Sequence, residues 1–226
     1  MFLLLSDFYL SDLPFGGGAE YNDQILYDLM SSKGIKINRK RSREATHDYL
    51  VSLKKDTKII VSNFIQLSES SKNYIINNFD YIIYEHDHKY LRRRIPSLFY
   101  NFKAPDSEIV NYSFYKSAKA VLSQSGFHKK IIKLNIDIDN IVNLSGNLWT
   151  DLDFEQFKNQ KLIFLPTIPE TFSRICIEAK MMGCSVITNG MVGAKYEEWY
   201  QLKGQELIDT MVNKRDMIID KIEGIF

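Results

Sequence analysis

Two glutamates in the last third of the chain, Glu170 and Glu178, have the side chains and the spacing to hold two sugar rings. A carboxylate accepts hydrogen bonds from neighbouring hydroxyl groups, so each glutamate could bind one sugar. Eight residues of helix span roughly 12 Å, which matches the separation of the hexose and the ribose in a nucleotide sugar. Two isolated glutamates are more often a first-turn residue and a residue on a solvated helix face, so their surroundings decide between the two interpretations.

The residues between the two glutamates are suited to binding phosphate. The pattern predicts a helix that starts at Pro169-Glu170-Thr171 and ends at Gly183. Phe172, Ser173 and Arg174 then lie in its first turn, where backbone N–H groups are unpaired and the helix dipole is positive. These amides and the Arg174 guanidinium are predicted to hold a diphosphate.

Apolar runs on both sides of this helix complete a β-α-β unit. Lys161–Leu165 is stopped by Pro166, and Ser185–Thr188 follows the terminating glycine as a second buried strand. In parallel sheets of this kind, ligands bind beyond the carboxyl ends of the strands and at helix N-termini.

The order of residues across segment 166–197 carries a family resemblance. A first Glu, seven intervening residues and a second Glu are followed by a small residue, a strand and a glycine-containing turn. The positions are Pro166, Glu170, Phe172, Ser173, Glu178 and Ala179, then Gly183, Cys184, Val186, Ile187 and Thr188, then Gly193, Ala194 and Glu197. This order resembles the donor site of retaining GT-B glycosyltransferases of the family 4 type. The chain departs from that pattern at Ser173-Arg174, where the family usually has Gly-Leu, and at Lys180, where it often has Met.

The resemblance implies a role for each part of this segment. Glu170 would bind the donor hexose and Glu178 the ribose, with the amides of Phe172, Ser173 and Arg174 on the diphosphate. The turn Gly16-Gly17-Gly18 before the first helix is by itself weak evidence for phosphate binding. In the family, a Gly-Gly-Ala-Glu turn after the first strand lies over the donor diphosphate, which gives these three glycines the same expected role.

A dense polar cluster, Glu85–Arg94, follows the apolar run Tyr81–Tyr84. His86 and His88 flank Asp87, but no third metal ligand is evident and alternating side chains on an extended segment diverge, so no metal site is predicted. The resemblance implies that His86 completes the sugar pocket and that Asp87 is the candidate for the acceptor hydroxyl. The candidate catalytic residues are therefore His86, Asp87 and Glu170.

The turn Ser145-Gly146 follows the expected strand Ile141–Leu144. Such a turn is compatible with phosphate binding and equally with an ordinary connection between a strand and a helix. Family members place an Arg and a Lys near this point to neutralise the leaving diphosphate. This turn has neither, so Lys158, Lys161 or Arg174 would have to serve.

Strands and helices alternate along the whole chain, which predicts an α/β protein. The resemblance implies a GT-B-like arrangement in which two small Rossmann-type parallel-sheet domains face a cleft. The best boundary lies in Asn135–Asp139, giving an acceptor-side domain of residues 1–137 and a nucleotide-sugar domain of residues 138–226. The long terminal helix Gly204–Phe226 could cross back onto the first domain or cap its own sheet.

Composition restricts the remaining classes of function. The net charge of +1 gives no global attraction to nucleic acid or membrane, and no apolar run reaches the length of a membrane span. Cys176 and Cys184 lack metal-site spacing, which favours buried free thiols in a reducing cytosol. Met1–Leu5 lacks a basic flank and is predicted to be a strand rather than a signal peptide. We therefore expect a cytoplasmic protein.

The basic run Arg39–Arg43 is predicted to be a solvated loop, because no aromatic residues are interleaved for base stacking. The alternative is a patch for an anionic acceptor. Together with Arg92–Arg94, this run could also belong to a nucleic-acid-binding protein.

Taken together, these observations favour a metal-independent, retaining hexosyltransferase that needs no cofactor and uses a nucleotide sugar, with UDP as the nucleotide expected from the resemblance. The acceptor is left open among carbohydrates, lipid-linked sugars, proteins and nucleic acids. Two further alternatives share the donor site: a nucleotide-sugar epimerase or hydrolase, and a binding module without turnover.

Overall fold

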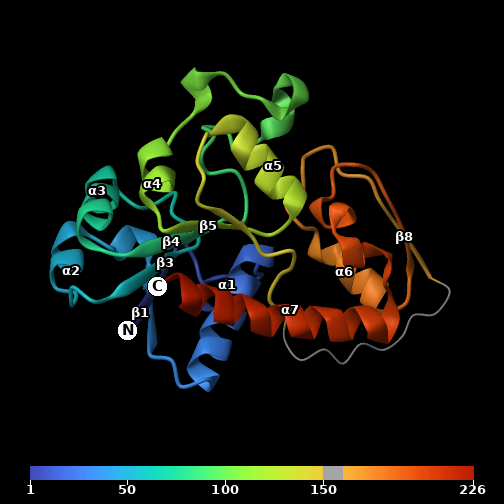
Figure 1. The fold of residues 1–226 in the computed structure, drawn as a ribbon, viewed down its shortest axis with the longest axis horizontal. Helices are drawn as coiled ribbons and strands as arrows, with labels where there is room; N and C mark the ends of the chain where they lie inside the picture. The colour runs from blue at the N-terminus through green and yellow to red at the C-terminus, as the bar shows by residue number, and fades with distance from the viewer. Residues whose placement is uncertain (150–159) are drawn as a thin grey trace.

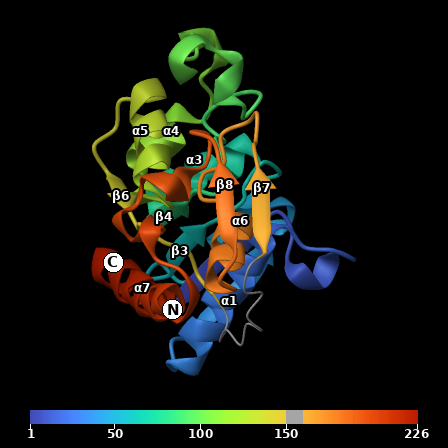
Figure 2. The same ribbon diagram turned by 90° about the vertical axis from the view of Figure 1, so that its right-hand side faces the viewer.

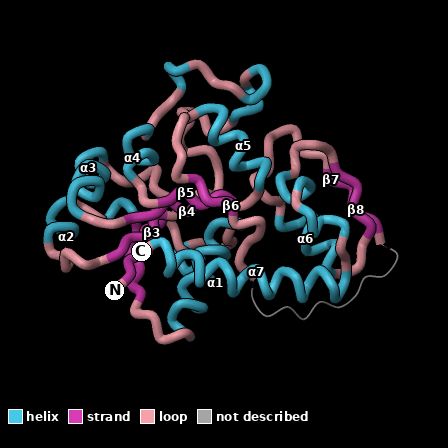
Figure 3. The backbone as a smooth tube through the Cα atoms, in the orientation of Figure 1, coloured by secondary structure: helices cyan, strands magenta, loops and turns pink. Residues whose placement is uncertain are grey.

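The computed structural model describes residues 1–149 and 160–226, and Lys158 lies outside them. Its centre is a six-stranded, all-parallel sheet in the order β2-β1-β3-β4-β5-β6 (Figures 1 and 3). The strands are β1 (Phe2–Ser6), β2 (Ile37–Arg41), β3 (Lys58–Val61), β4 (Tyr81–Tyr84), β5 (Ala120–Ser123) and β6 (Ile141–Asn143). The predicted α/β class is confirmed, with a Rossmann-like parallel sheet.

Helices cover both faces of this sheet because successive strand residues point to opposite sides. On one face Leu3 and Leu5 pack in a core that includes Leu50 of α2 and Ile75 of α3. On the other face Leu4 packs with residues of the first and last α-helices. The helices are α1 (Gly18–Ser32), α2 (His47–Val51), α3 (Glu69–Asn78), α4 (Tyr112–Ser117), α5 (Gly126–Asn135), α6 (Arg174–Met181) and α7 (Gly204–Ile225).

A smaller unit follows the large sheet. It contains the two-stranded parallel sheet β7 (Lys161–Phe164) and β8 (Ser185–Thr188), seen beside α6 in Figure 2. A third core cluster, including Phe172, Ile177 and Met211, lies within this unit. Two short 3₁₀ helices, Gly193–Tyr196 and Glu198–Gln201, follow β8.

The strand β6 belongs to the large sheet. Val121 of β5 pairs with Ile141 of β6, so the boundary expected after residue 137 falls inside the six-stranded sheet. Among the described residues, the second sheet has only two strands. The fold is therefore one large Rossmann-like sheet with a small two-stranded sheet, in place of two sheets of similar size.

The terminal helix α7 links the two units. Its first half contributes Leu207 and Met211 to the core of the smaller unit, and its second half contributes Ile218 and Ile222 to the core of the large sheet. Phe226 ends the chain against Phe2, with ring centroids 5.4 Å apart. Both expectations for this helix therefore hold, since it packs on its own unit and crosses back onto the first (Figure 1).

The basic run does not form the solvated loop expected from the sequence. Arg39, Lys40 and Arg41 lie in the edge strand β2 and are half-buried. The Arg41 guanidinium pairs with Asp12, and Arg39 lies 4.3 Å from the ring centroid of Tyr27. No helix of the described part of the chain is long and apolar enough to cross a membrane.

Candidate functional site

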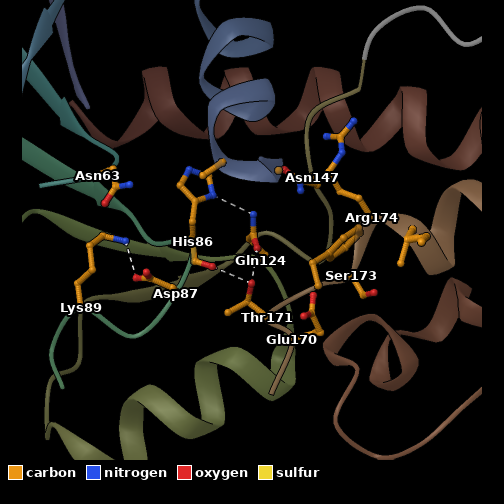
Figure 4. A pocket seen from close by; sticks show the side chains of 14 residues that line it. Asn63, His86, Asp87, Lys89, Gln124, Asn147, Glu170, Thr171, Ser173 and Arg174 are labelled. Atoms are coloured by element: carbon orange, nitrogen blue, oxygen red, sulfur yellow. Dashed lines mark hydrogen bonds and ion pairs between the residues drawn. The ribbon is translucent and has the colours of Figure 1, made fainter. Parts of the chain in front are cut away.

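A cavity of about 370 Å³ lies beyond the carboxyl ends of β3, β4 and β5 (Figure 4). The starts of α1 and α6 close its other sides. Its lining residues are Gly18, Ala19, Asn63, His86, Asp87, Lys89, Gln124, Asn147, Glu170, Thr171, Phe172, Ser173, Arg174 and Ile175. Ligands bind at this edge of parallel α/β sheets, which makes the cavity the candidate site.

The structure brings seven of the predicted site residues to this cavity: Gly18, His86, Asp87, Glu170, Phe172, Ser173 and Arg174. The other five, Gly16, Gly17, Ser145, Gly146 and Glu178, do not line it. Lys89, in the polar cluster that follows β4, also lines the cavity, whereas sequence reasoning missed Asn63, Gln124, Asn147 and Thr171. Asn63 and Gln124 follow buried parallel strands directly or within two residues, so the rule on strand ends could have found them.

The helix α6 begins at Arg174, which corrects the expected start near Glu170. Ser173 precedes it with a φ of 75°, in the left-handed region that glycine adopts most easily. Phe172 and Ser173 therefore lie before the first turn, whose amides belong to Arg174, Ile175 and Cys176. The two glutamates also do not share one helix, so the distance derived from helix rise does not apply to them.

Glu170 is held by its backbone instead of by a helix. Its N–H donates to the carbonyl of Met191 and its carbonyl accepts from the N–H of Gly193, both at 2.8 Å. These bonds form an isolated bridge beside β8 that fixes the carboxyl group in the cavity wall. Burial raises the pKa of the Glu170 carboxyl above its usual value.

Arg174 joins the starts of two helices. Its Nη1 donates to the carbonyl of Leu148 at 2.9 Å, and its guanidinium lies 4.2 Å from the centroid of the Trp149 ring. A Cβ on Gly18 would lie 3.4 Å from Cδ of Arg174, so the start of α1 lies close to the Arg174 side chain. Burial lowers the pKa of Arg174 somewhat, and Glu178 opposes that shift.

Glu178 lies one turn further along α6 and outside the cavity. Its Oε1 is 3.4 Å from Nε of Arg174, and its side chain is 35% exposed. It therefore contacts the site through Arg174.

A chain of polar contacts connects the large sheet to the smaller unit (Figure 4). Nε2 of Gln124 lies 3.1 Å from Nδ1 of His86, and Oε1 of Gln124 lies 2.7 Å from Oγ1 of Thr171. The same Thr171 hydroxyl lies 2.9 Å from the His86 carbonyl oxygen. The His86 ring stacks on Tyr84 at 4.8 Å. These contacts fix both His86 and the residue next to Glu170.

Asp87 belongs to a buried ionic network. Nζ of Lys89 donates to Glu85 at 2.7 Å and to Asp87 at 2.8 Å, and Arg94 Nη1 reaches the second Asp87 oxygen at 3.1 Å. Burial favours a higher pKa for Asp87, but Lys89 and Arg94 outweigh it and hold that pKa well below its usual range. Asp87 is thus a fixed anion and a weak proton acceptor.

The turn at Ser145 has a different environment from the one predicted. The Ser145 hydroxyl donates to the Glu197 carboxylate, and Trp199 Nε1 donates to the Ser145 carbonyl at 2.9 Å. The other Glu197 oxygen accepts from the N–H of Gly126, the first residue of α5, at 2.7 Å. This cluster ties α5 to the end of β6, away from the cavity.

The first two glycines of the triplet also contact other groups. A Cβ on Gly16 would lie 2.2 Å from Cδ1 of Leu10, so this glycine packs on the preceding loop. The Gly17 N–H donates to Glu20 at 2.9 Å. Of the three glycines, only Gly18 reaches the cavity.

No group of three His, Cys, Asp or Glu side chains in residues 1–149 and 160–226 is placed to bind a metal ion. Cys176 and Cys184 are both buried. Comparisons of the sequence with protein-family models and with curated proteins gave no match.

Proposed function

We propose that the protein is a GT-B-like glycosyltransferase that transfers a hexosyl group from a nucleotide sugar to an acceptor hydroxyl. The cavity would hold the donor diphosphate between the two units. The proposal rests mainly on one observation: the starts of α1 and α6 meet at one cavity, where Gly18 lies near Arg174. Two helix N-termini direct unpaired N–H groups and positive dipole ends at the same space, which favours an anion with two phosphates.

Arg174 is the proposed cation for the leaving diphosphate. Lys89, the other Lys or Arg in the cavity wall, has its charge offset by Glu85 and Asp87. Arg174 faces one partly exposed carboxylate at 3.4 Å. A guanidinium and helix amides stabilise developing negative charge without a metal ion, which is the role the reaction requires.

The sugar would lie against Glu170 and His86. His86 follows β4 of the large sheet and Glu170 belongs to the smaller unit, and the hydroxyl of the adjacent Thr171 contacts the His86 carbonyl oxygen and the Gln124 amide oxygen. A carboxylate whose backbone is held on both sides can accept from hexose hydroxyls in one geometry. Glu178 beside Arg174 would contact the ribose where the nucleotide leaves the cavity.

The charge state of Asp87 bears on the acceptor step. Because Lys89 and Arg94 keep it ionised, Asp87 is better suited to orienting the acceptor than to taking its proton. The leaving phosphate would then accept that proton on the same face of the sugar, as retention of configuration requires.

The test is direct measurement of donor binding and turnover. Wild-type protein is titrated with UDP and a panel of nucleotide sugars, and products with candidate acceptors are identified by mass spectrometry. Glu170→Gln should reduce transfer at least tenfold, since a lost hydrogen bond to a charged group contributes about 1.5–3 kcal/mol. Glu223→Gln, an exposed change in α7, is the control. Equal turnover by both variants contradicts the site assignment. Release of free hexose without an acceptor would indicate a hydrolase, and formation of an epimer would indicate an epimerase. Binding of a nucleotide sugar without any product would indicate a binding module.

A further inference from the structure

Asp23 on α1 is a buried carboxylate without a compensating hydrogen bond. Its side chain is fully buried, and neither of its oxygens has a hydrogen-bond partner among the described residues. An unpaired carboxylate in a protein interior is costly, so its presence there calls for a partner that becomes charged. His86 is that partner, since its Nε2 lies 3.5 Å from Oδ1 of Asp23.

The surroundings of His86 determine which ring nitrogen carries its proton. The Thr171 hydroxyl can donate to Oε1 of Gln124 at 2.7 Å, which directs the Gln124 amide nitrogen to Nδ1 of His86 at 3.1 Å. Nδ1 is then an acceptor, and the single proton of the neutral ring is on Nε2. That N–H points toward Asp23.

The other titratable groups around this pair leave Asp23 uncompensated. Tyr9, from the loop after β1, and Tyr84, from β4, both face Asp23, and burial raises the pKa of each phenol above its usual value. Both are therefore neutral. The Arg39 guanidinium lies over the rings of Tyr9 and Tyr27 and donates to Oε1 of Gln24 at 2.7 Å.

The two cationic side chains that line the cavity, Lys89 and Arg174, are already bound to other groups and do not compensate Asp23. Lys89 is held by Glu85 and by Asp87, and Arg174 contacts Glu178 and the Leu148 carbonyl. The positive charge that can compensate the Asp23 carboxylate is therefore that of a protonated His86 ring.

We propose that Asp23 is a positioning residue for His86: it holds the Nε2–H and stabilises a second proton on the ring, so that His86 becomes cationic when a diphosphate fills the cavity. The inference rests on the proposed function for the identity of the anion. The proton comes from solvent and binds Nδ1, and no other bond forms or breaks. The resulting positive charge lies in the wall beside the phosphates and offsets part of their charge.

Gln124 and Thr171 can satisfy both protonation states. When Nδ1 gains its proton, the Gln124 amide turns over and its oxygen accepts from Nδ1–H. The amide nitrogen then donates to the Thr171 hydroxyl, which donates in turn to the His86 carbonyl oxygen 2.9 Å away. The ring nitrogens and the Gln124 amide keep partners in both states, and the single Thr171 hydroxyl proton moves from Oε1 of Gln124 to the His86 carbonyl oxygen, so the network accommodates the added proton.

The first test is independent of any ligand. Side-chain nitrogen NMR of the free wild-type protein should show His86 as the Nε2–H tautomer above its titration midpoint, and an Nδ1–H tautomer overturns the proposal. Asp23→Asn should move that midpoint to lower pH by about one unit or more, because the attraction to the ring proton is lost. Asp28→Asn, which removes an exposed carboxylate from the same helix, should leave it unchanged.

The second test uses UDP as the probe. Calorimetric titrations in two buffers with different ionisation enthalpies, above the His86 midpoint, should show proton uptake by the wild type and less uptake by Asp23→Asn. Binding with equal uptake by both overturns the proposal while leaving the proposed function intact. Absence of UDP binding instead contradicts the proposed function, and the NMR midpoint then decides the role of Asp23. If Asp23→Asn does not fold, two other measurements test the role of Asp23. The wild type should show the Nε2–H tautomer of His86, and His86→Gln should lose the proton uptake on UDP binding.

Discussion

Gly18 and Arg174, 156 residues apart in the sequence, approach each other closely where two helices begin. A Cβ built on Gly18 would be 3.4 Å from Cδ of Arg174, which is an ordinary van der Waals separation. Both residues line the cavity beyond β3, β4 and β5. The contact sets how closely the two helix starts approach each other, and hence how many of their amides can reach one ligand.

Side chains of increasing size at Gly18 test this relationship. Gly18→Ala should keep near-parental UDP affinity, because a methyl group fits at 3.4 Å. Gly18→Val should weaken UDP binding, because its additional methyl groups displace Arg174 or the start of α1. Affinity is measured by calorimetry, with thermal unfolding to confirm that both variants fold. Equal affinity for Ala and Val would show that the contact does not position the ligand.

Arg174 is expected to contribute its charge and its planar geometry. Arg174→Ala should weaken UDP binding about 10- to 100-fold, since a hydrogen bond to a charged group contributes about 1.5–3 kcal/mol. Arg174→Lys should restore only part of this affinity, because an ammonium cannot reproduce the contacts with the Leu148 carbonyl and the Trp149 ring. Arg43→Ala, at an exposed position, is the control. A similar loss in the control would mean that net charge, and not this site, attracts the nucleotide.

The large sheet was predictable because buried parallel strands appear in the sequence as continuous apolar runs. Tyr81–Tyr84 of this sheet has the bounds of the apolar run, and so does Ser185–Thr188 of the small sheet, although that strand is half-buried or exposed along its length and not buried as predicted. The start of α4 at Tyr112 is harder to predict, because the preceding Asn111 adopts a φ of 58°. A left-handed backbone at a residue other than glycine is set by its environment: Asn111 Oδ1 accepts from Lys72 Nζ, and Asn111 Nδ2 donates to the Lys89 carbonyl.

The site was predictable in part, for a similar reason. His86 was singled out through the family resemblance, and its position after a buried strand is one that Gln124 shares, so the rule on strand ends would have added Gln124. The late start of α6 was missed because Glu170 pairs with residues 191 and 193, and such long-range pairing leaves no local pattern. Asp23 had a signal that was overlooked: at helical spacing it shares a face with Leu26 and Met30, both buried.

The buried Lys89 should be important for stability. Lys89→Met removes the cation between Glu85 and Asp87 and leaves a buried carboxylate unpaired, which costs about 3–5 kcal/mol of unfolding free energy. Urea unfolding measures this loss. Lys119→Met breaks an exposed pair with Asp80 at 2.8 Å and should cost at most about 1 kcal/mol. Comparable losses in the two variants would show that the network around Lys89 is not buried in solution.

His88 should make the protein sensitive to mild acid. Burial lowers its pKa to about 4, whereas an unfolded chain protonates histidine near its usual value of about 6.5. Between these values the unfolded state binds more protons, so unfolding free energy falls as the pH decreases from about 6.5 to about 4, by about 3 kcal/mol from this residue. His88→Gln should unfold with a smaller difference between pH 7 and pH 5. His47→Gln, at an exposed histidine, should keep the parental pH dependence.

Gly193 fixes the junction that holds Glu170, and it leaves no space for a side chain. A Cβ there would lie 2.2 Å from the Thr171 carbonyl oxygen and 2.5 Å from Oγ of Ser125, which themselves form a hydrogen bond at 2.6 Å. Gly193→Ala must therefore displace the Thr171 backbone, and with it the neighbouring Glu170 carboxyl, so we expect lower stability and weaker binding of a UDP-sugar. Gly224→Ala, in α7 with open space around it, should be neutral or raise unfolding free energy by up to about 1 kcal/mol. Because Thr171 also contacts Gln124, the Gly193 variant should change the His86 nitrogen signals as well, whereas the Gly224 variant should not. A Gly193 variant that binds the sugar nucleotide as the parent does, with unchanged His86 signals, would show that this junction does not position the site.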